Sequence, residues 1–177
     1  EDCLDFDYIV KGEGENVILN ILRNDVTSKI ITAPRIKDLD IVPYPAWDLV
    51  ECFSDELFPG ERYGKTGKGM TVIASRGCPY KCSFCANLFN TPITYRSVSN
   101  IMGELGELKK RGVEYIRFED DNITIHPDFE DLCLSIKKLN IHWKCHTRSK
   151  LVTLPKVEIM KWAGCEECGV GVESADD

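Results

Sequence analysis

"MTVIASRGCPYKCSFC", residues 70–85, joins a short apolar run to three cysteines that lie within eight positions. The run at residues 70–74 predicts a buried β-strand, because apolar and β-branched residues follow one another over the length of a strand. Gly77 and Pro79 flank the first cysteine with a flexible residue and one that lacks an amide hydrogen. The cysteines are therefore expected in a loop that leaves the strand, and not on a helix.

The spacing of Cys78, Cys82 and Cys85 is C-x3-C-x2-C. On a continuous helix these positions would share one face, so three buried, unreactive thiols are one interpretation. A structural zinc site normally closes with four protein ligands, most often as paired C-x2-C motifs. Three thiolates in one loop instead suit three irons of a 4Fe-4S cluster and leave the fourth iron open. We expect the cluster, with zinc and buried thiols as alternatives.

Composition limits the classes of protein to consider. The chain has 177 residues, 22 Lys plus Arg against 29 Asp plus Glu, and a net charge of −7, so nothing favours binding to nucleic acid. Apolar stretches are too short to span a membrane, and we expect no signal peptide and no membrane span. Nine cysteines, an odd number, favour metal or redox use over a disulfide framework. The predicted location is the cytoplasm.

From residue 70 onward, strand and helix patterns alternate with short connections. Such alternation predicts parallel strands, right-handed crossovers and an α/β fold. Four strands are enough for a curved sheet but too few to close a barrel. The predicted strands are 70–75, 113–119, 141–147 and 168–172, and the predicted helices lie near 98–111, 127–139 and 155–163.

The first 69 residues do not show this regular alternation of strand and helix patterns. Residues 1–23 predict a strand at 6–10, a glycine turn and a helix. Residues 24–69 lack a sustained period and contain four prolines, so they are predicted to be a linker anchored by apolar side chains such as Trp47 and Leu49. Residues 70–177 are then the core. A lone strand–helix unit and an open last strand both need neighbours, so we expect further chain at both ends.

Residues 75–85, "SRGCPYKCSFC", resemble the signature loop of the radical S-adenosylmethionine (radical SAM) enzymes, including the aromatic Phe84 before the last cysteine. The likeness extends to "DYIVKGEGENVILNIL" at 7–22, "LDIVPYPAWDLV" at 39–50, "FEDDNIT" at 118–124 and "AGCEECGVGVES" at 163–174. These stretches are similar to the cobalamin-dependent branch of that superfamily, in which a Rossmann-like cobalamin-binding domain precedes the radical domain. The resemblance implies that residues 70–177 form part of a partial (β/α) TIM-like barrel, with about four βα units, and that residues 1–23 are the C-terminal tail of the cobalamin-binding domain. The cobalamin-binding histidine motif of that branch is absent, so cobalamin is expected in a full-length parent only.

The resemblance implies that Cys78, Cys82 and Cys85 hold a 4Fe-4S cluster whose open iron binds S-adenosylmethionine, from which a 5′-deoxyadenosyl radical is generated. It also implies a set of cofactor-binding residues, in which Phe84 lies beside the adenine, Arg148 pairs with the carboxylate, and Glu173 accepts from the ribose or amino group. Because parallel strands of such barrels point their C-terminal ends at the site, acidic and polar residues there join the set. The expected cofactor-binding residues are Phe84, Asp120, Asp121, Arg148, Glu173 and Ser174. A solvated acidic turn is the alternative for Asp120 and Asp121, and a surface ion pair for Arg148.

The implied parent enzyme is a radical methyltransferase, or it catalyses a cyclisation or rearrangement of an organic substrate that the sequence does not identify. An external electron donor of the flavodoxin or ferredoxin type is implied as well. A methylthiotransferase-like radical SAM enzyme is the alternative within the superfamily. A zinc-stabilised interaction module that uses Cys82, Cys85, Cys165 and Cys168 is the alternative that is not an enzyme. The isolated chain is expected to be inactive.

Overall fold

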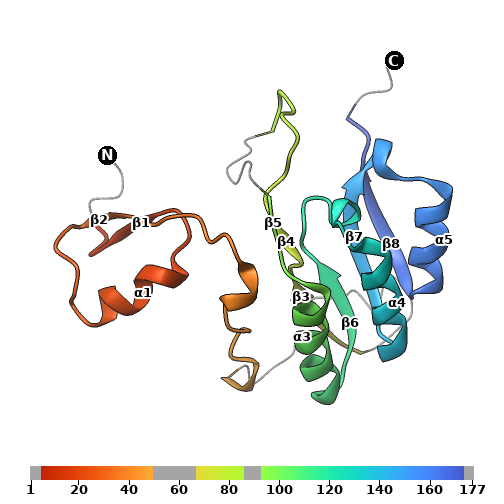
Figure 1. The fold of residues 1–177 in the computed structure, drawn as a ribbon, viewed down its shortest axis with the longest axis horizontal. Helices are drawn as coiled ribbons and strands as arrows, with labels where there is room; N and C mark the ends of the chain where they lie inside the picture. The colour runs from red at the N-terminus through yellow and green to blue at the C-terminus, as the bar shows by residue number, and fades with distance from the viewer. Residues whose placement is uncertain (1–4, 50–66, 86–92, 174–177) are drawn as a thin grey trace. The chain divides into compact units, whose positions relative to one another are not determined.

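The computed structural model describes residues 5–49, 67–85 and 93–173 (Figure 1). The chain divides into two compact units, residues 1–42 and 43–177. Among the described residues, no helix is both long enough and apolar enough to cross a membrane. Two further apolar side chains expected to anchor the linker, Phe53 and Phe58, lie outside the described residues.

The first unit is a small strand–helix–strand arrangement. Strand β1 (Ile9–Lys11) begins three residues later than the predicted strand at 6–10 and leads through the predicted glycine turn into helix α1 (Glu15–Leu22). Strand β2 (Ile30–Thr32) pairs with β1 in parallel. Gly12 has a φ of 110°, and a side chain there would collide with the carbonyl of Ala33. The sequence did not predict β2, because three residues among polar neighbours form too short a pattern to be recognised.

The second unit is an α/β fold built on one parallel sheet. Its strands are β3 (Lys68–Val72), β6 (Val113–Phe118), β7 (His142–Arg148) and β8 (Cys165–Gly171), in the order β3-β6-β7-β8. Helices α3 (Val98–Lys110), α4 (Phe129–Leu139) and α5 (Leu154–Trp162) alternate with them in the chain. Figure 1 shows the helices on one side of the sheet. The predicted α/β fold with four parallel strands is confirmed.

The core lies between this sheet and its helices. The largest side chains that are fully buried include Trp143 on β7, Phe118 on β6 and Leu105 on α3. The rings of Phe118 and Trp143 meet edge to face with their centroids 5.7 Å apart, and the indole of Trp143 donates to the Ala163 carbonyl. Burial of such apolar and aromatic area is the main stabilising contribution to a fold of this size.

In the second unit, the first and the last strand of the parallel sheet differ from their predicted bounds. The first predicted strand, 70–75, is divided between β3 and a second short strand, β4 (Ser75–Arg76), which pairs antiparallel with β5 (Thr94–Tyr95). The last strand begins at Cys165 instead of residue 168, because its charged residues Glu166 and Glu167 interrupt the apolar pattern that the prediction relied on. Leu49, expected to anchor the linker, is 77% exposed, whereas Trp47 packs against the core.

Helix α3 begins with a side-chain cap whose contribution to stability can be measured. The Ser97 hydroxyl accepts a hydrogen bond from the backbone amide of Asn100 at 3.1 Å. Ser97→Ala removes this acceptor and is expected to lower the free energy of unfolding by about 1 kcal/mol. Ser97→Asp keeps an acceptor at the cap and is expected to retain the stability, as measured by urea unfolding. Equal losses in the two variants would contradict the capping role.

Candidate functional site

The cysteine loop leaves the sheet between two short paired strands. The pairing of β4 with β5 brings Arg76 opposite Thr94 and so closes the base of the loop. Gly77 has a φ of 100°, a conformation that other residues rarely adopt, and it turns the chain out of β4 directly before Cys78. Strand, glycine turn and loop thus follow one another as the sequence predicts.

The carboxylate of Asp120 ties the start of this loop to the main sheet. Asp120 follows β6 and is 3% exposed, and it accepts hydrogen bonds from the backbone amide of Ala74, at 2.9 Å, and from the hydroxyl of Ser75. Burial raises the pKa of Asp120 above its ordinary value, and the hydrogen bonds from Ala74 and Ser75 oppose that rise. Asp120 therefore fixes the segment between β3 and β4, and it does not line the cavity described next.

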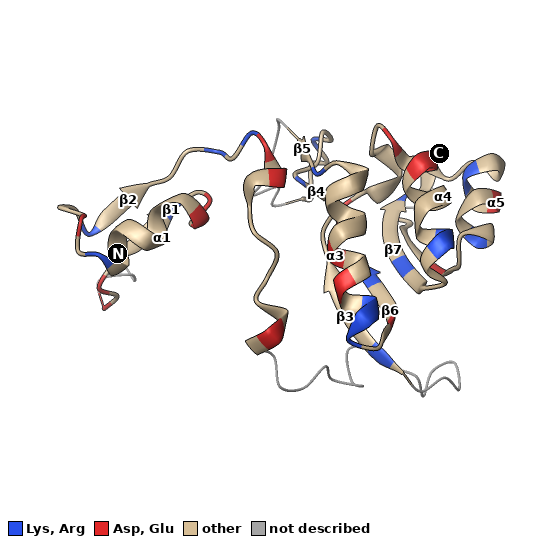
Figure 2. Cartoon of the chain, turned by 60° about the horizontal axis from the view of Figure 1, so that its bottom comes forward, with Lys and Arg blue, Asp and Glu red and all other residues tan. Residues whose placement is uncertain are grey.

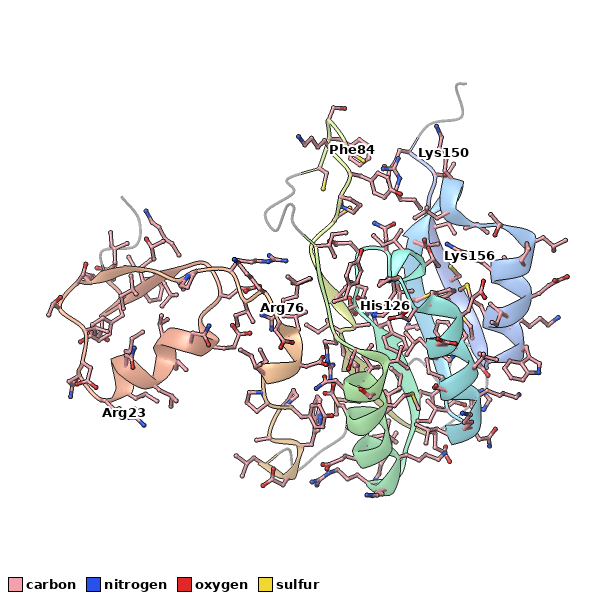
Figure 3. All side chains as sticks on the ribbon, in the orientation of Figure 1. Arg23, Arg76, Phe84, His126, Lys150 and Lys156 are labelled. Carbon is pink, nitrogen blue, oxygen red and sulfur yellow. The ribbon has the colours of Figure 1, made fainter. Side chains whose placement is uncertain are left out.

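The three cysteines lie along a cavity of about 910 Å³ at the C-terminal ends of β6, β7 and β8. Figure 3 shows Phe84 near the tip of the loop, at the same end of the sheet as Lys150, which follows β7. The loop and the strand ends both contribute to the lining. The lining residues named by the sequence analysis are Cys78, Cys82, Cys85, Phe84, Asp121, Arg148 and Glu173.

The structure thus brings together most of the predicted site residues around one cavity. Phe84 lies on the loop and is 66% exposed, and it lines the same cavity as Arg148 and Glu173 from the strand ends. Glu119, beside Asp120, forms an ion pair with Arg117. Ser174 lies outside the described residues. Convergence of loop and strand ends on one cavity is the arrangement that binds small ligands in α/β folds.

Two side chains from the strand ends place N–H donors against cysteine sulfurs. The Nδ2 atom of Asn122 lies 3.3 Å from Sγ of Cys78, and Nη1 of Arg148 lies 3.5 Å from Sγ of Cys82. The Arg148 guanidinium also stacks over the ring of Tyr80, 4.0 Å from its centroid. A cation–π contact of this kind holds the arginine against the loop. The cavity therefore pairs electron-rich sulfurs with hydrogen-bond donors.

The sequence analysis did not single out Asn122 or Tyr80 as site residues. Asn122 stood out only as the first residue of an N-x-T glycosylation pattern. Its position just after a parallel strand could have identified it as a site residue, because residues at the C-terminal ends of such strands face the site. Tyr80 lies inside the cysteine motif, but nothing in its spacing indicates a contact with Arg148. Both contacts depend on tertiary structure.

Four other cysteines of the described residues, Cys133, Cys145, Cys165 and Cys168, lie apart from the motif. Sγ of Cys145 lies 3.9 Å from Sγ of Cys168, and Cys165 and Cys168 line a second cavity of about 600 Å³. A side-chain hydrogen bond with Cys165, together with burial, raises the pKa of Cys145, and burial raises the pKa of Cys133 to about 12 and that of Cys168 above its ordinary value. Burial thus disfavours the thiolate form of Cys133 and Cys168.

The zinc alternative is not formed by the described residues. Cys82 and Cys85 lie on the first cavity and Cys165 and Cys168 on the second. In the part of the chain that the structure describes, no three His, Cys, Asp or Glu side chains converge closely enough to hold one metal ion. Cys165 is instead the first residue of β8, and Cys168 packs against the core.

Several known proteins are similar to this chain in sequence. An uncharacterised methyltransferase of Pyrococcus horikoshii is 28% identical over 98% of this chain and 42% of its own length. The bacteriochlorophyllide d C-12(1)-methyltransferase of Chlorobaculum tepidum is 31% identical over 58% of this chain and 24% of its own length. The anaerobic magnesium-protoporphyrin IX monomethyl ester cyclase of Rubrivivax gelatinosus is 27% identical over 96% of this chain and 35% of its own length. The chain thus spans less than half the length of these relatives.

Among solved structures, the radical S-adenosylmethionine methyltransferase TsrM from Kitasatospora setae is similar in fold. The form with cobalamin and a 4Fe-4S cluster bound has a TM-score of 0.54 at 17% identity, over 60% of this chain and 21% of that one. The family model described as the radical SAM superfamily matches residues 72–177. This match covers β6, β7, β8, their helices and the cysteine loop. Because it spans more than half of the chain, the chain belongs to the radical SAM superfamily.

Proposed function

We propose that Cys78, Cys82 and Cys85 bind three irons of a 4Fe-4S cluster and that S-adenosylmethionine binds at the fourth. The observation that carries this proposal is that all three cysteines line one cavity with Asn122 and Arg148, whose N–H groups are directed at two of the sulfurs. Three cysteine thiols that line one cavity match in number the three irons that a cubane with one open iron presents to the protein.

When bound, the cluster and S-adenosylmethionine supply radical chemistry that amino-acid side chains cannot provide. The residues of this chain bind and orient the two groups. In this proposal Arg148 pairs with the carboxylate of S-adenosylmethionine, Glu173 accepts from its ribose or amino group, and Phe84 lies beside its adenine. Asp121 on the cavity wall completes the polar set. Arginine suits a carboxylate partner because its planar guanidinium donates two parallel hydrogen bonds.

The proposed role of Arg148 predicts weaker binding of S-adenosylmethionine in Arg148→Gln. Loss of a charge-assisted hydrogen bond worth about 1.5–3 kcal/mol corresponds to an affinity roughly tenfold to a hundredfold lower. Equilibrium dialysis with iron-loaded protein under anaerobic conditions measures the difference. Lys150→Gln removes the same charge two residues away, from a side chain outside the cavity lining, and is expected to bind like the wild type. Equal affinities in all three proteins would contradict the assignment.

Anaerobic reconstitution with iron and sulfide tests the cluster itself. We expect a brown protein with about four irons per chain and an electron paramagnetic resonance signal, after reduction, that changes when S-adenosylmethionine is added. The change in the signal reports an iron that is open to a ligand from outside the protein. A colourless, fully folded protein that holds zinc and no iron would overturn the proposal.

For the whole protein we propose a radical methyltransferase, with cyclisation or rearrangement of an organic substrate as the other outcome. The names of the relatives support this choice, since two are methyltransferases and one is a cyclase. We further propose that residues 1–23 end a cobalamin-binding domain, residues 24–69 link it to the core, and residues 70–177 form that core. A relative in fold has cobalamin bound.

The proposed partners follow from this chemistry. Reduction of the cluster needs an external electron donor of the flavodoxin or ferredoxin type, which places the protein in the cytoplasm in this proposal. Nucleic acid is not among the proposed partners. Figure 2 shows Lys and Arg interspersed with Asp and Glu over helices α3, α4 and α5, and the net charge is −7. A phosphate backbone binds basic surfaces, so mixed charge gives it no preferred face.

A further inference from the structure

Asn122 is a buried amide at the edge of the cysteine cavity. It follows β6, is 5% exposed, and lines the cavity together with the three cysteines. The next two residues, Ile123 and Thr124, are buried in the short 3-10 helix Ile123–Ile125, which holds the backbone at this point. Asn122 therefore has a fixed position relative to Cys78, whose sulfur lies 3.3 Å from its Nδ2.

The hydrogen bonding of this amide is unusual for a structural residue. Its Oδ1 is buried and has no hydrogen-bond partner among the described residues. A buried carbonyl without a partner costs about 1–3 kcal/mol, so an apolar side chain would serve the stability of the fold better. The contact that the amide does make is with a cysteine sulfur. An iron-bound thiolate only accepts hydrogen bonds, and the NH₂ end is the half of the amide that can donate one.

We infer that Asn122 is a positioning residue that raises the reduction potential of the cluster by donating a hydrogen bond to the Cys78 thiolate. This inference rests on the proposed function. Reduction adds one negative charge to the cluster and its thiolates, and a donor at the sulfur stabilises that charge more in the reduced state than in the oxidised state. The donor therefore favours the reduced state.

Asn122 is a cleaner probe of this effect than Arg148. Arg148 also places a donor on a sulfur, but it carries a charge and is proposed to bind S-adenosylmethionine. Asn122 is neutral, so its replacement by leucine, which has a similar shape, removes the donor without altering the charge of the site. Asn122→Asp has nearly the same shape too, and it replaces the donor with an anionic oxygen.

The test is a redox titration of the iron-loaded protein without S-adenosylmethionine, followed by the electron paramagnetic resonance signal of the reduced cluster. We expect Asn122→Leu to lower the midpoint potential enough to change the equilibrium between reduced and oxidised cluster about tenfold, or about 59 mV for one electron. Asn122→Asp is expected to lower it further. Iron content and unfolding midpoint should stay near the wild-type values in the leucine variant, which separates tuning of the cluster from loss of structure.

The matched control is Asn140→Asp. Asn140 ends α4 in a left-handed conformation, with a φ of 49°, and precedes β7, at the opposite end of the sheet from the cavity. The same chemical change there is expected to leave the potential unchanged. A loaded Asn122→Leu protein with the wild-type potential would overturn the inference and leave the proposed function standing. A wild-type protein that takes up no cluster would overturn both. If the Asn122→Asp protein takes up no cluster, the midpoint potential of Asn122→Leu alone tests the inference.

Discussion

Cys78→Ala is expected to abolish cluster binding, with iron content falling from about four to less than one per chain after anaerobic reconstitution. Three protein thiolates hold the proposed cluster, and the loss of one leaves a second iron without a protein ligand. Cys78 lies in a loop and is only half-buried, so the fold should survive the change. Iron and sulfide assays together with the visible spectrum measure the loss, and far-ultraviolet circular dichroism checks the fold.

Cys165→Ala is the matched control for this experiment. Cys165 is also half-buried, but it lies on the second cavity, at the start of β8. The cluster proposal predicts full iron content in this variant. A zinc module built from Cys82, Cys85, Cys165 and Cys168 predicts the reverse, since Cys78→Ala would keep its metal and Cys165→Ala would lose it. Iron retained in Cys78→Ala would therefore count against the assignment of the motif.

The features that the sequence predicted well are those set by local patterns. Short apolar runs and the alternation of strand and helix patterns predicted the parallel strands and their helices, and Gly77 predicted the turn into the cysteine loop. These signals work because one strand or one helix turn contains the whole pattern. The cysteine spacing likewise lies within eight residues, so the resemblance to radical SAM enzymes is visible in the sequence alone.

The features that the sequence could not predict depend on contacts between distant residues. Asp120 and Asp121 are neighbours with the same side chain, yet Asp120 is buried against the start of the loop and Asp121 lines the cavity. Side chains alternate in direction along extended chain, but the point at which β6 ends decides which aspartate faces which way. The contact between Asn122 and Cys78 spans 44 positions in the sequence. Neither outcome has a local signature.

The contacts of Arg96 also join residues that are distant in the sequence, and they hold the segment that precedes the cysteine loop. It follows β5, is 8% exposed, and donates to the Ile73 carbonyl at 2.8 Å and to Glu104 on α3 at 2.6 Å. Its own backbone amide donates to the Ala74 carbonyl. Asp120 accepts a hydrogen bond from the Ala74 amide. Together these contacts fix Ile73 and Ala74, the two residues that precede β4. We therefore expect the buried ion pair between Arg96 and Glu104 to contribute to the position of the cysteines.

Glu104→Ala is expected to lower the free energy of unfolding by about 3–5 kcal/mol, because it leaves the Arg96 guanidinium buried without its carboxylate partner. Glu104 also accepts a hydrogen bond from the Trp47 indole, which is lost as well. Urea unfolding followed by tryptophan fluorescence measures the change. All three tryptophans lie in the second unit, so the signal reports that unit alone.

Two further variants of α3 make this result interpretable. Glu107→Ala is the same substitution at an exposed position one helical turn later, and it should change the stability by no more than about 0.5 kcal/mol. Glu104→Gln keeps a carbonyl oxygen for Arg96 and Trp47. Its free energy of unfolding should therefore fall between those of the two alanine variants. A loss below about 1 kcal/mol in Glu104→Ala would mean that the ion pair does not hold the segment. A loss of the expected size, with reduced iron uptake, would support a contribution of the ion pair between Arg96 and Glu104 to the position of the cluster loop.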